Sequence, residues 1–130
     1  MSLSIGELAK QAGVAIDTVR YYERNGLLAP AGRLASGYRR YGAEELKRLR
    51  FIRRAKALGF SLDDIRSLLA LSAERDVARV RTAAQIKLAD IEQRIAELDR
   101  IRKALSQLVA ACPGHGLSDA CPILSALTKE

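Results

Sequence analysis

Residues 76–110 contain neither proline nor glycine, and their apolar side chains recur every three or four positions. This spacing is close to the heptad repeat of coiled coils, with small phase slips. A helix of that length spans roughly 50 Å, which is longer than a small domain is wide. Because no turn signal interrupts it, the sequence predicts that a second copy of the chain covers the apolar stripe, rather than a hairpin within one chain. The stripe consists of Val77, Val80, Ala84, Leu88, Ile91, Ile95, Leu98, Ile101, Leu105 and Leu108.

The positive charge is confined to the front of the chain. Residues 1–60 hold 12 Lys and Arg against five Asp and Glu, whereas residues 61–130 hold ten of each, so the net charge of +7 lies entirely in the first part. Such an excess indicates a surface that faces a polyanion, and a neutral remainder with another task. The composition is 48% hydrophobic, with three prolines and many helix formers. It favours a folded, all-α chain.

Two short helices are expected at the start of the chain. Ser4 and Glu7 have the spacing of a capping box, and Gly13 is placed to end the first helix. Asp17 or a neighbour is expected to begin the second helix, which covers Thr18–Arg24 before Asn-Gly stops it. Two helices joined by a glycine-containing turn form a helix-turn-helix.

The second helix and the segment after it carry hydrogen-bond donors of the kind that contact duplex DNA. Hydrogen-bond donors and aromatic rings on the second helix suit a helix that contacts base edges in the major groove. A hairpin around Ser36-Gly37 would form a small β wing, whose arginines and tyrosines suit phosphate contacts. A helix at residues 43–58 presents a further basic face and is followed by a helix capped by Ser61. The donors on the second helix are Thr18, Arg20, Tyr21 and Arg24.

Four stretches taken together resemble the MerR family of bacterial transcription regulators. They are SIGELAKQAGVAIDTVRYYERNGLL, SGYRRY, LKRLRFIRRAKALGFSLDDIRSLL and the long helix, which follow one another over nearly the whole chain. The resemblance implies a winged helix-turn-helix domain at residues 1–72, an antiparallel coiled-coil dimerisation helix at 73–111, and an effector-binding loop with a short terminal helix at 112–130. It also implies a dimer that distorts a palindromic promoter so that RNA polymerase engages it, at a cost in DNA deformation that backbone contacts offset.

The resemblance assigns positions to individual DNA-binding residues of this sequence. Thr18, Arg20 and Tyr21 would lie on the recognition helix. The wing would carry Arg33, Tyr38 and Arg39, and Arg54 would face phosphate from the second helical pair.

Both cysteines and the only histidine lie in the segment CPGHGLSDAC, residues 112–121. Pro122 suits the first position of a helix, which places Cys121 at its N-cap, where the thiolate is favoured. Cys112 and Cys121 are soft ligands for Cu(I) or for a divalent ion such as Zn(II), Cd(II) or Pb(II), with His115 as a candidate third ligand. Members of the family that sense divalent metals usually have a further cysteine where this chain has Val77, which argues against a three-thiolate site.

Two other interpretations of the cysteine loop stay open. The pair is also suited to a reversible disulfide in a regulator that senses oxidants or electrophiles, and a loop that binds nothing is the third possibility. A helical metal-binding protein without DNA contacts would leave the charge asymmetry unexplained. The sequence shows no catalytic constellation, no secretory signal and no run of about 18 apolar residues, so we expect a cytoplasmic protein that is not an enzyme and does not enter a membrane.

Overall fold

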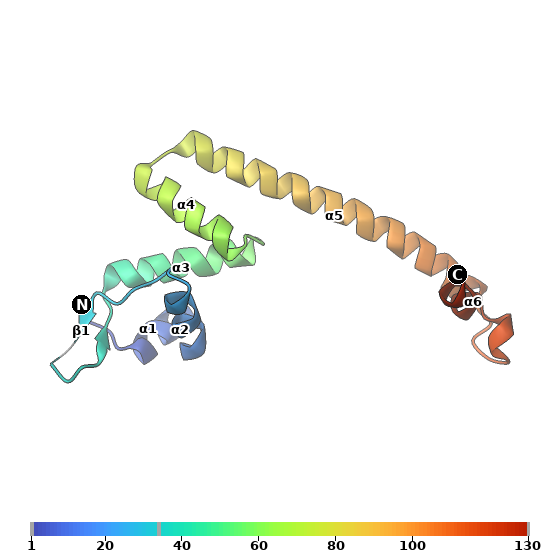
Figure 1. Cartoon of the computed structure of the whole chain (residues 1–130), viewed down its shortest axis with the longest axis horizontal. Coiled ribbons are helices and arrows are strands. Elements are labelled where there is room, and N and C mark those ends of the chain that lie inside the picture. The colour runs from blue at the N-terminus through green and yellow to red at the C-terminus, as the bar shows by residue number, and fades with distance from the viewer. Residues whose placement is uncertain (1, 34, 130) are drawn as a thin grey trace. The chain divides into compact units, whose positions relative to one another are not determined.

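The computed structural model describes residues 2–33 and 35–129. Within that part of the chain the structure is helical apart from one two-stranded wing (Figure 1). The predicted all-α class with a small β wing is therefore confirmed. By its internal contacts the chain divides into two compact units, Met1–Arg81 and Thr82–Glu130.

The helix-turn-helix consists of α1 (Ile5–Ala12) and α2 (Ile16–Arg24). The capping box predicted at the start of α1 is present, and Gly13 ends the helix at a φ of 72°. The predicted start of the second helix was wrong by two residues. The carbonyl of Ala15 accepts from the backbone N–H groups of Thr18 at 3.0 Å and Val19 at 3.3 Å, so the helix begins without a side-chain cap.

The wing is an antiparallel pair formed by β1 (Gly32–Arg33) and β2 (Arg39–Arg40), with Arg33 opposite Arg39. Next to it, Tyr41 and Leu3 exchange backbone hydrogen bonds of 2.7 and 2.9 Å. The segment before α1 is therefore tied to the end of the wing, and the wing extends from a fixed base.

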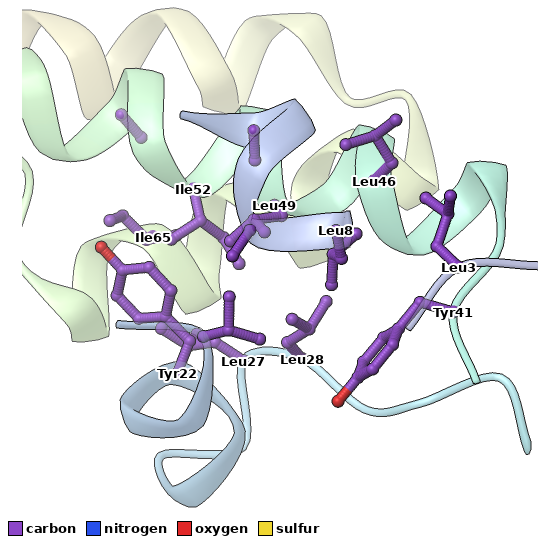
Figure 2. Close-up of a cluster of buried hydrophobic side chains, with 14 residues drawn as sticks. Leu3, Leu8, Tyr22, Leu27, Leu28, Tyr41, Leu46, Leu49, Ile52 and Ile65 are labelled. Atoms are coloured by element: carbon purple, nitrogen blue, oxygen red, sulfur yellow. The ribbon is translucent and has the colours of Figure 1, made fainter. Parts of the chain in front are cut away.

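One hydrophobic core holds the helix-turn-helix against α3 (Ala43–Ala57) and α4 (Leu62–Glu74). Figure 2 shows Tyr41 beside Leu3 at one end of this cluster and Ile65 beside Tyr22 at the other. Each large side chain buried in it contributes about 1.5–3 kcal/mol of transfer free energy. The buried members are Leu3, Leu8, Ala9, Ala12, Val19, Tyr22, Leu27, Leu28, Tyr41, Leu46, Leu49, Ile52, Ala55 and Ile65.

Three arginines on α3 and α4 bind the carbonyl groups that end the helix-turn-helix segments. Arg53 Nη1 donates to the oxygen of Ala12 at 2.6 Å, and Arg48 Nε donates to that of Leu27 at 2.6 Å. Arg66 Nη2 donates to the oxygen of Asn25 at 2.7 Å. A charged donor at a helix C-terminus satisfies an orphan carbonyl and complements the helix dipole. Arg53 lies on the helix predicted to present a basic face; it is exposed and also holds the end of α1.

The long helix α5 (Val77–Ala111) is continuous, as Figure 1 shows, and begins after Asp76, whose Oδ1 accepts from the N–H of Arg79 at 3.1 Å. The preceding residue, Arg75, ends α4 with a φ of 58°. After α5 come a short 3-10 turn, η1 (Ser118–Ala120), and α6 (Pro122–Thr128). None of the helices in the described residues is long and apolar enough to cross a membrane.

We predict that alanine is tolerated less well at Gly13 than at Gly26, although both have nearly the same φ, 72° and 73°. Either substitution forces a left-handed alanine, at about 1–2 kcal/mol. At Gly13 the new Cβ would also lie 2.7 Å from Arg53 Nη1, whereas no atom lies within 4 Å at Gly26. Urea unfolding at fixed protein concentration should therefore give Gly13→Ala the larger loss of stability.

The same pair of substitutions in an Arg53→Met background provides the control. Without the guanidinium, the two alanine variants should lose equal stability. Equal losses in the wild-type background would show that Arg53 is not held rigidly against the end of α1.

Candidate nucleic-acid interface and thiol site

A basic cleft of about 750 Å³ lies between α2 and the wing. Four arginines line it, Arg20 and Arg24 from α2 and Arg33 and Arg39 from the wing, together with the carboxylate of Glu23. A concave surface lined mainly by one sign of charge focuses its field and attracts the opposite charge. The complete lining is Ile5, Arg20, Glu23, Arg24, Leu28, Ala29, Pro30, Arg33, Gly37, Tyr38 and Arg39.

Four of the seven residues predicted to contact DNA are brought together in this cleft. They are Arg20, Arg33, Tyr38 and Arg39. Arg24, which the sequence grouped with them, is there as well. Three others lie outside its lining: Thr18 and Tyr21 elsewhere on α2, and Arg54 exposed on α3.

The adjacent tyrosines of α2 divide between surface and core, as expected for neighbouring helical positions. Tyr21 is 46% exposed and Tyr22 only 7%. Arg20 is exposed too, and its Nη1 lies 3.9 Å from Asp17 Oδ1 in a loose, exposed ion pair, so its guanidinium is available to a ligand. The surface of α2 therefore offers a guanidinium and a phenol side by side.

Glu23 was not among the residues predicted from the sequence, although its carboxylate joins α2 to the wing. Its Oε1 accepts from Arg39 Nη1 at 3.2 Å and from the Tyr41 hydroxyl at 2.8 Å. Only 10% of the Glu23 side chain is exposed, so the pair is shielded from solvent on that side. Opposite charges at such a site hold each other more firmly than exposed ones. Glu23 therefore sets the position of the wing relative to α2. The only signal in the sequence was an acidic residue between two arginines, Arg20 and Arg24.

The phenol of Tyr41 stays protonated to unusually high pH. Burial raises its pKa, and the hydrogen bond that it donates to Glu23 raises it further, to about 12. Both effects favour the neutral phenol, because a phenolate would be poorly solvated and would face a carboxylate. The hydrogen bond to Glu23 is therefore formed throughout the physiological pH range.

The two cysteines lie together at the end of α5. Cys112 Sγ and Cys121 Sγ are 3.3 Å apart, and both side chains are partly buried. Cys121 is the N-cap of α6 and Pro122 is its first residue, as the sequence predicted. The loop between them turns back on itself through Gly114 and Gly116, whose φ values are 80° and 97°. A ten-residue segment thus closes on a pair of sulfur atoms.

The surroundings of Cys121 favour its thiolate. The backbone N–H of Leu124 lowers the pKa of Cys121 most, and the neighbouring thiol of Cys112 lowers it further. Cys121 stands at the N-terminus of α6, where backbone N–H groups and the helix dipole favour a negative charge. A thiolate is the form that binds a metal ion.

The imidazole of His115 is turned toward its own loop. Its Nδ1 lies 3.0 Å from the carbonyl oxygen of Pro113, and the residue is exposed. Across the described residues, no three His, Cys, Asp or Glu side chains are grouped so that they could hold a metal ion. The donor set present is therefore a pair of sulfurs. It suits a thiophilic ion with low coordination number and is too small for a closed four-ligand zinc site.

Residues 3–72, more than half of the chain, match the family profile described as MerR HTH family regulatory protein. The chain belongs to the MerR family. Residues 46–108 also match a profile described as MerR, DNA binding. The protein is thus a DNA-binding transcriptional regulator and not an enzyme, as the sequence indicated.

Named relatives are similar over nearly their whole length. The HTH-type transcriptional regulator HmrR of Rhizobium leguminosarum bv. viciae is 44% identical over 128 residues, which cover 97% of this chain and 98% of that protein. A mercuric resistance operon regulatory protein of Pseudomonas fluorescens is 39% identical over 97% of this chain and 88% of its own. The crystal structure of the regulator PbrR691 from Ralstonia metallidurans CH34, in complex with lead(II), is 34% identical, with a TM-score of 0.85 over 97% of this chain and 99% of that one.

We predict that Tyr41 makes the stability of this MerR-family protein fall as the pH rises above 10. Because the pKa of Tyr41 is raised from 10.0 to about 12 in the folded state, the unfolded chain loses this proton first. The contribution is fully present below pH 10 and is lost between about 10 and 12. Urea unfolding at a series of pH values should show a shallower alkaline decline in Tyr41→Phe than in the wild type.

The comparison with Tyr41→Phe removes every other effect of alkaline pH, because both proteins share it. Parallel declines in the wild type and in Tyr41→Phe would contradict the raised pKa of Tyr41.

Proposed function

We propose that this protein regulates transcription as a homodimer that binds a palindromic promoter and responds to a thiophilic metal ion held by Cys112 and Cys121. The observation that carries the proposal is the presence, in one MerR-family chain, of a basic cleft beside the helix-turn-helix and a 3.3 Å sulfur pair in the other compact unit. The proposed division is residues 1–72 for DNA binding, 73–111 for dimerisation and 112–130 for the effector.

The proposed DNA-binding residues have two different tasks. Thr18, Arg20 and Tyr21 on α2 would reach base edges in the major groove, where bidentate arginine contacts carry sequence information. Arg33, Tyr38 and Arg39 on the wing, together with Arg54 on α3, would contact phosphates, which fix register without reading sequence. The exposure of Arg20 and Tyr38 supports this division, because both are available to a ligand.

The partner proposed for α5 is the α5 of a second chain. Within the single chain no described residue of this helix is buried, although large apolar side chains line it. Burying one such side chain is worth about 1.5–3 kcal/mol, so a row of them strongly favours pairing. Antiparallel pairing would set two DNA-binding units apart, as a dyad-symmetric site requires. The exposed side chains are Val77, Ile86, Leu88, Ile95, Leu98, Ile101, Leu105 and Val109.

A dimer with two fixed DNA-binding units suits a mechanism based on DNA shape. Binding both halves of a palindrome whose spacing is unfavourable requires the duplex to bend or untwist, at a cost of order 1–10 kcal/mol that phosphate contacts on both halves offset. The promoter elements would then be presented differently to RNA polymerase in the two effector states. RNA polymerase is therefore the second macromolecular partner in this proposal.

Two similar proteins support a thiophilic metal as the effector, because one is a mercuric resistance operon regulatory protein and the crystal structure of the other is of its complex with lead(II). In this chain the first residue of α5 is Val77, which is 78% exposed and supplies no third sulfur. Two sulfurs suffice for Cu(I), whereas Zn(II), Cd(II) or Pb(II) would recruit His115 or a residue of the second chain. The metal would link the end of α5 to the start of α6 through its two bonds to sulfur.

We predict that Arg20→Ala and Arg54→Ala weaken DNA binding in different ways. The probe is a palindromic duplex that the wild-type protein selects from a random pool. Arg20→Ala should cost about 1–3 kcal/mol on that duplex and relax its sequence preference. Arg54→Ala should weaken binding to all duplexes alike and reduce the salt dependence by about one phosphate contact.

Arg100→Ala is the matched control, because it removes an exposed positive charge from the neutral part of the chain. It should leave DNA affinity unchanged. Sedimentation should show dimers for all three variants. A monomeric Arg20→Ala variant would contradict the placement of Arg20 on a DNA-facing helix.

We predict that Cys112→Ser abolishes both metal binding and the promoter response to every ion in a titration with Cu(I), Zn(II), Cd(II) and Pb(II). His115→Ala should leave Cu(I) affinity unchanged and weaken the divalent ions, because two sulfurs satisfy only the ion of low coordination number. The readouts are stoichiometry and transcription from the bound promoter. An unchanged response of Cys112→Ser to all four ions would exclude the metal hypothesis.

A further inference from the structure

The 3.3 Å separation of Cys112 Sγ and Cys121 Sγ lies between the separations that two different chemical states require. A disulfide needs about 2.05 Å, so the sulfurs would have to approach by about 1.3 Å. Two thiolates on one tetrahedral ion with bonds of about 2.3 Å lie about 3.8 Å apart, so the sulfurs would have to separate by about 0.5 Å. Small movements in opposite directions therefore lead to a covalent bond or to a metal site.

We propose that a peroxide closes a Cys112–Cys121 disulfide within one chain and thereby switches off metal binding. This proposal rests on the proposed metal-binding function, because it names a second signal acting on the same two sulfurs. The disulfide and the metal site exclude each other, since each needs both sulfur atoms. A chain in the oxidised state would not respond to the metal.

The chemistry balances with a peroxide as the oxidant. One cysteine sulfur attacks a peroxide oxygen, the O–O bond breaks, and a sulfenic acid and one water form. The second sulfur attacks the sulfenic sulfur, the S–O bond breaks, and the disulfide forms with release of a second water. Two thiols are oxidised and one hydrogen peroxide is reduced to two waters.

The surroundings of the pair permit this closure within one chain. Both sulfurs are partly buried and face each other, so the resolving thiol is already next to the site of attack. The chain has no other cysteine, so no competing disulfide within the chain exists. Gly114 and Gly116 lie in the loop between the cysteines, and no atom would lie within 4 Å of a Cβ added at either. At these two glycines no neighbouring group opposes the small backbone movement that brings the sulfurs together.

The test uses the full-length reduced dimer and hydrogen peroxide at a small molar excess. Free thiols should fall from two per chain to none, the chain mass should fall by about 2 Da, and the chain should run as a monomer on a denaturing gel without reductant. Reduced protein mixed with Pb(II) should show a sulfur-to-lead absorption band. The band should be absent after oxidation with peroxide and should return after treatment with dithiothreitol. Bound Pb(II) should slow the loss of thiols.

Cys112→Ser and Cys121→Ser are the matched variants, because each keeps one thiol and cannot form the internal bond. Neither variant should lose about 2 Da. That result would show that the mass loss of the wild type comes from the bond between Cys112 and Cys121 and not from oxidation of another residue. Persistent thiols, higher oxides or chains linked to each other in the wild type would overturn the disulfide proposal. A reduced protein that binds none of the four ions Pb(II), Cu(I), Zn(II) and Cd(II) would instead overturn the metal-binding function, whatever the outcome with peroxide.

Discussion

In the single chain the 35-residue helix α5 buries none of its described side chains, and its apolar row is exposed to water. Its apolar row must be covered, and the described part of the chain offers no element with which to cover it along its length. In the proposed homodimer, a second copy would cover the row and would supply a second DNA-binding unit and a second sulfur pair without any further sequence. Two-fold symmetry would then follow from the pairing of the two apolar rows.

Some basic side chains of the front unit are exposed and still make contacts within the domain, which a count of charges does not reveal. Arg48 and Arg53 donate to backbone carbonyls, and Arg39 is paired with Glu23. These contacts hold α3 against the helix-turn-helix and the wing against α2 before any ligand arrives. Pre-organisation of this kind reduces the entropy lost on binding. The arginines that line the basic cleft are therefore held by a pre-organised domain.

Much of the fold could be predicted from local signals in the sequence. Capping boxes, glycines after helices and the heptad spacing gave the long helix and most helix ends correctly, because these signals act between residues close in sequence. The start of α2 was missed because Ala15 caps it through its backbone alone, which leaves no mark in the side chains. The cysteine pair was found because the residue types are rare in this chain. Glu23 was missed because its partners, Arg39 and Tyr41, are more than 15 positions away, and only the fold brings them together.

Arg75 ends α4 in the left-handed conformation with a side chain attached, at a cost of roughly 1–2 kcal/mol that glycine would avoid. A residue with a Cβ has far fewer alternative backbone conformations than glycine, and Asp76 holds the first turn of α5 immediately after it. The backbone between α4 and the first turn of α5 is therefore restricted to fewer conformations than a glycine at this position would allow.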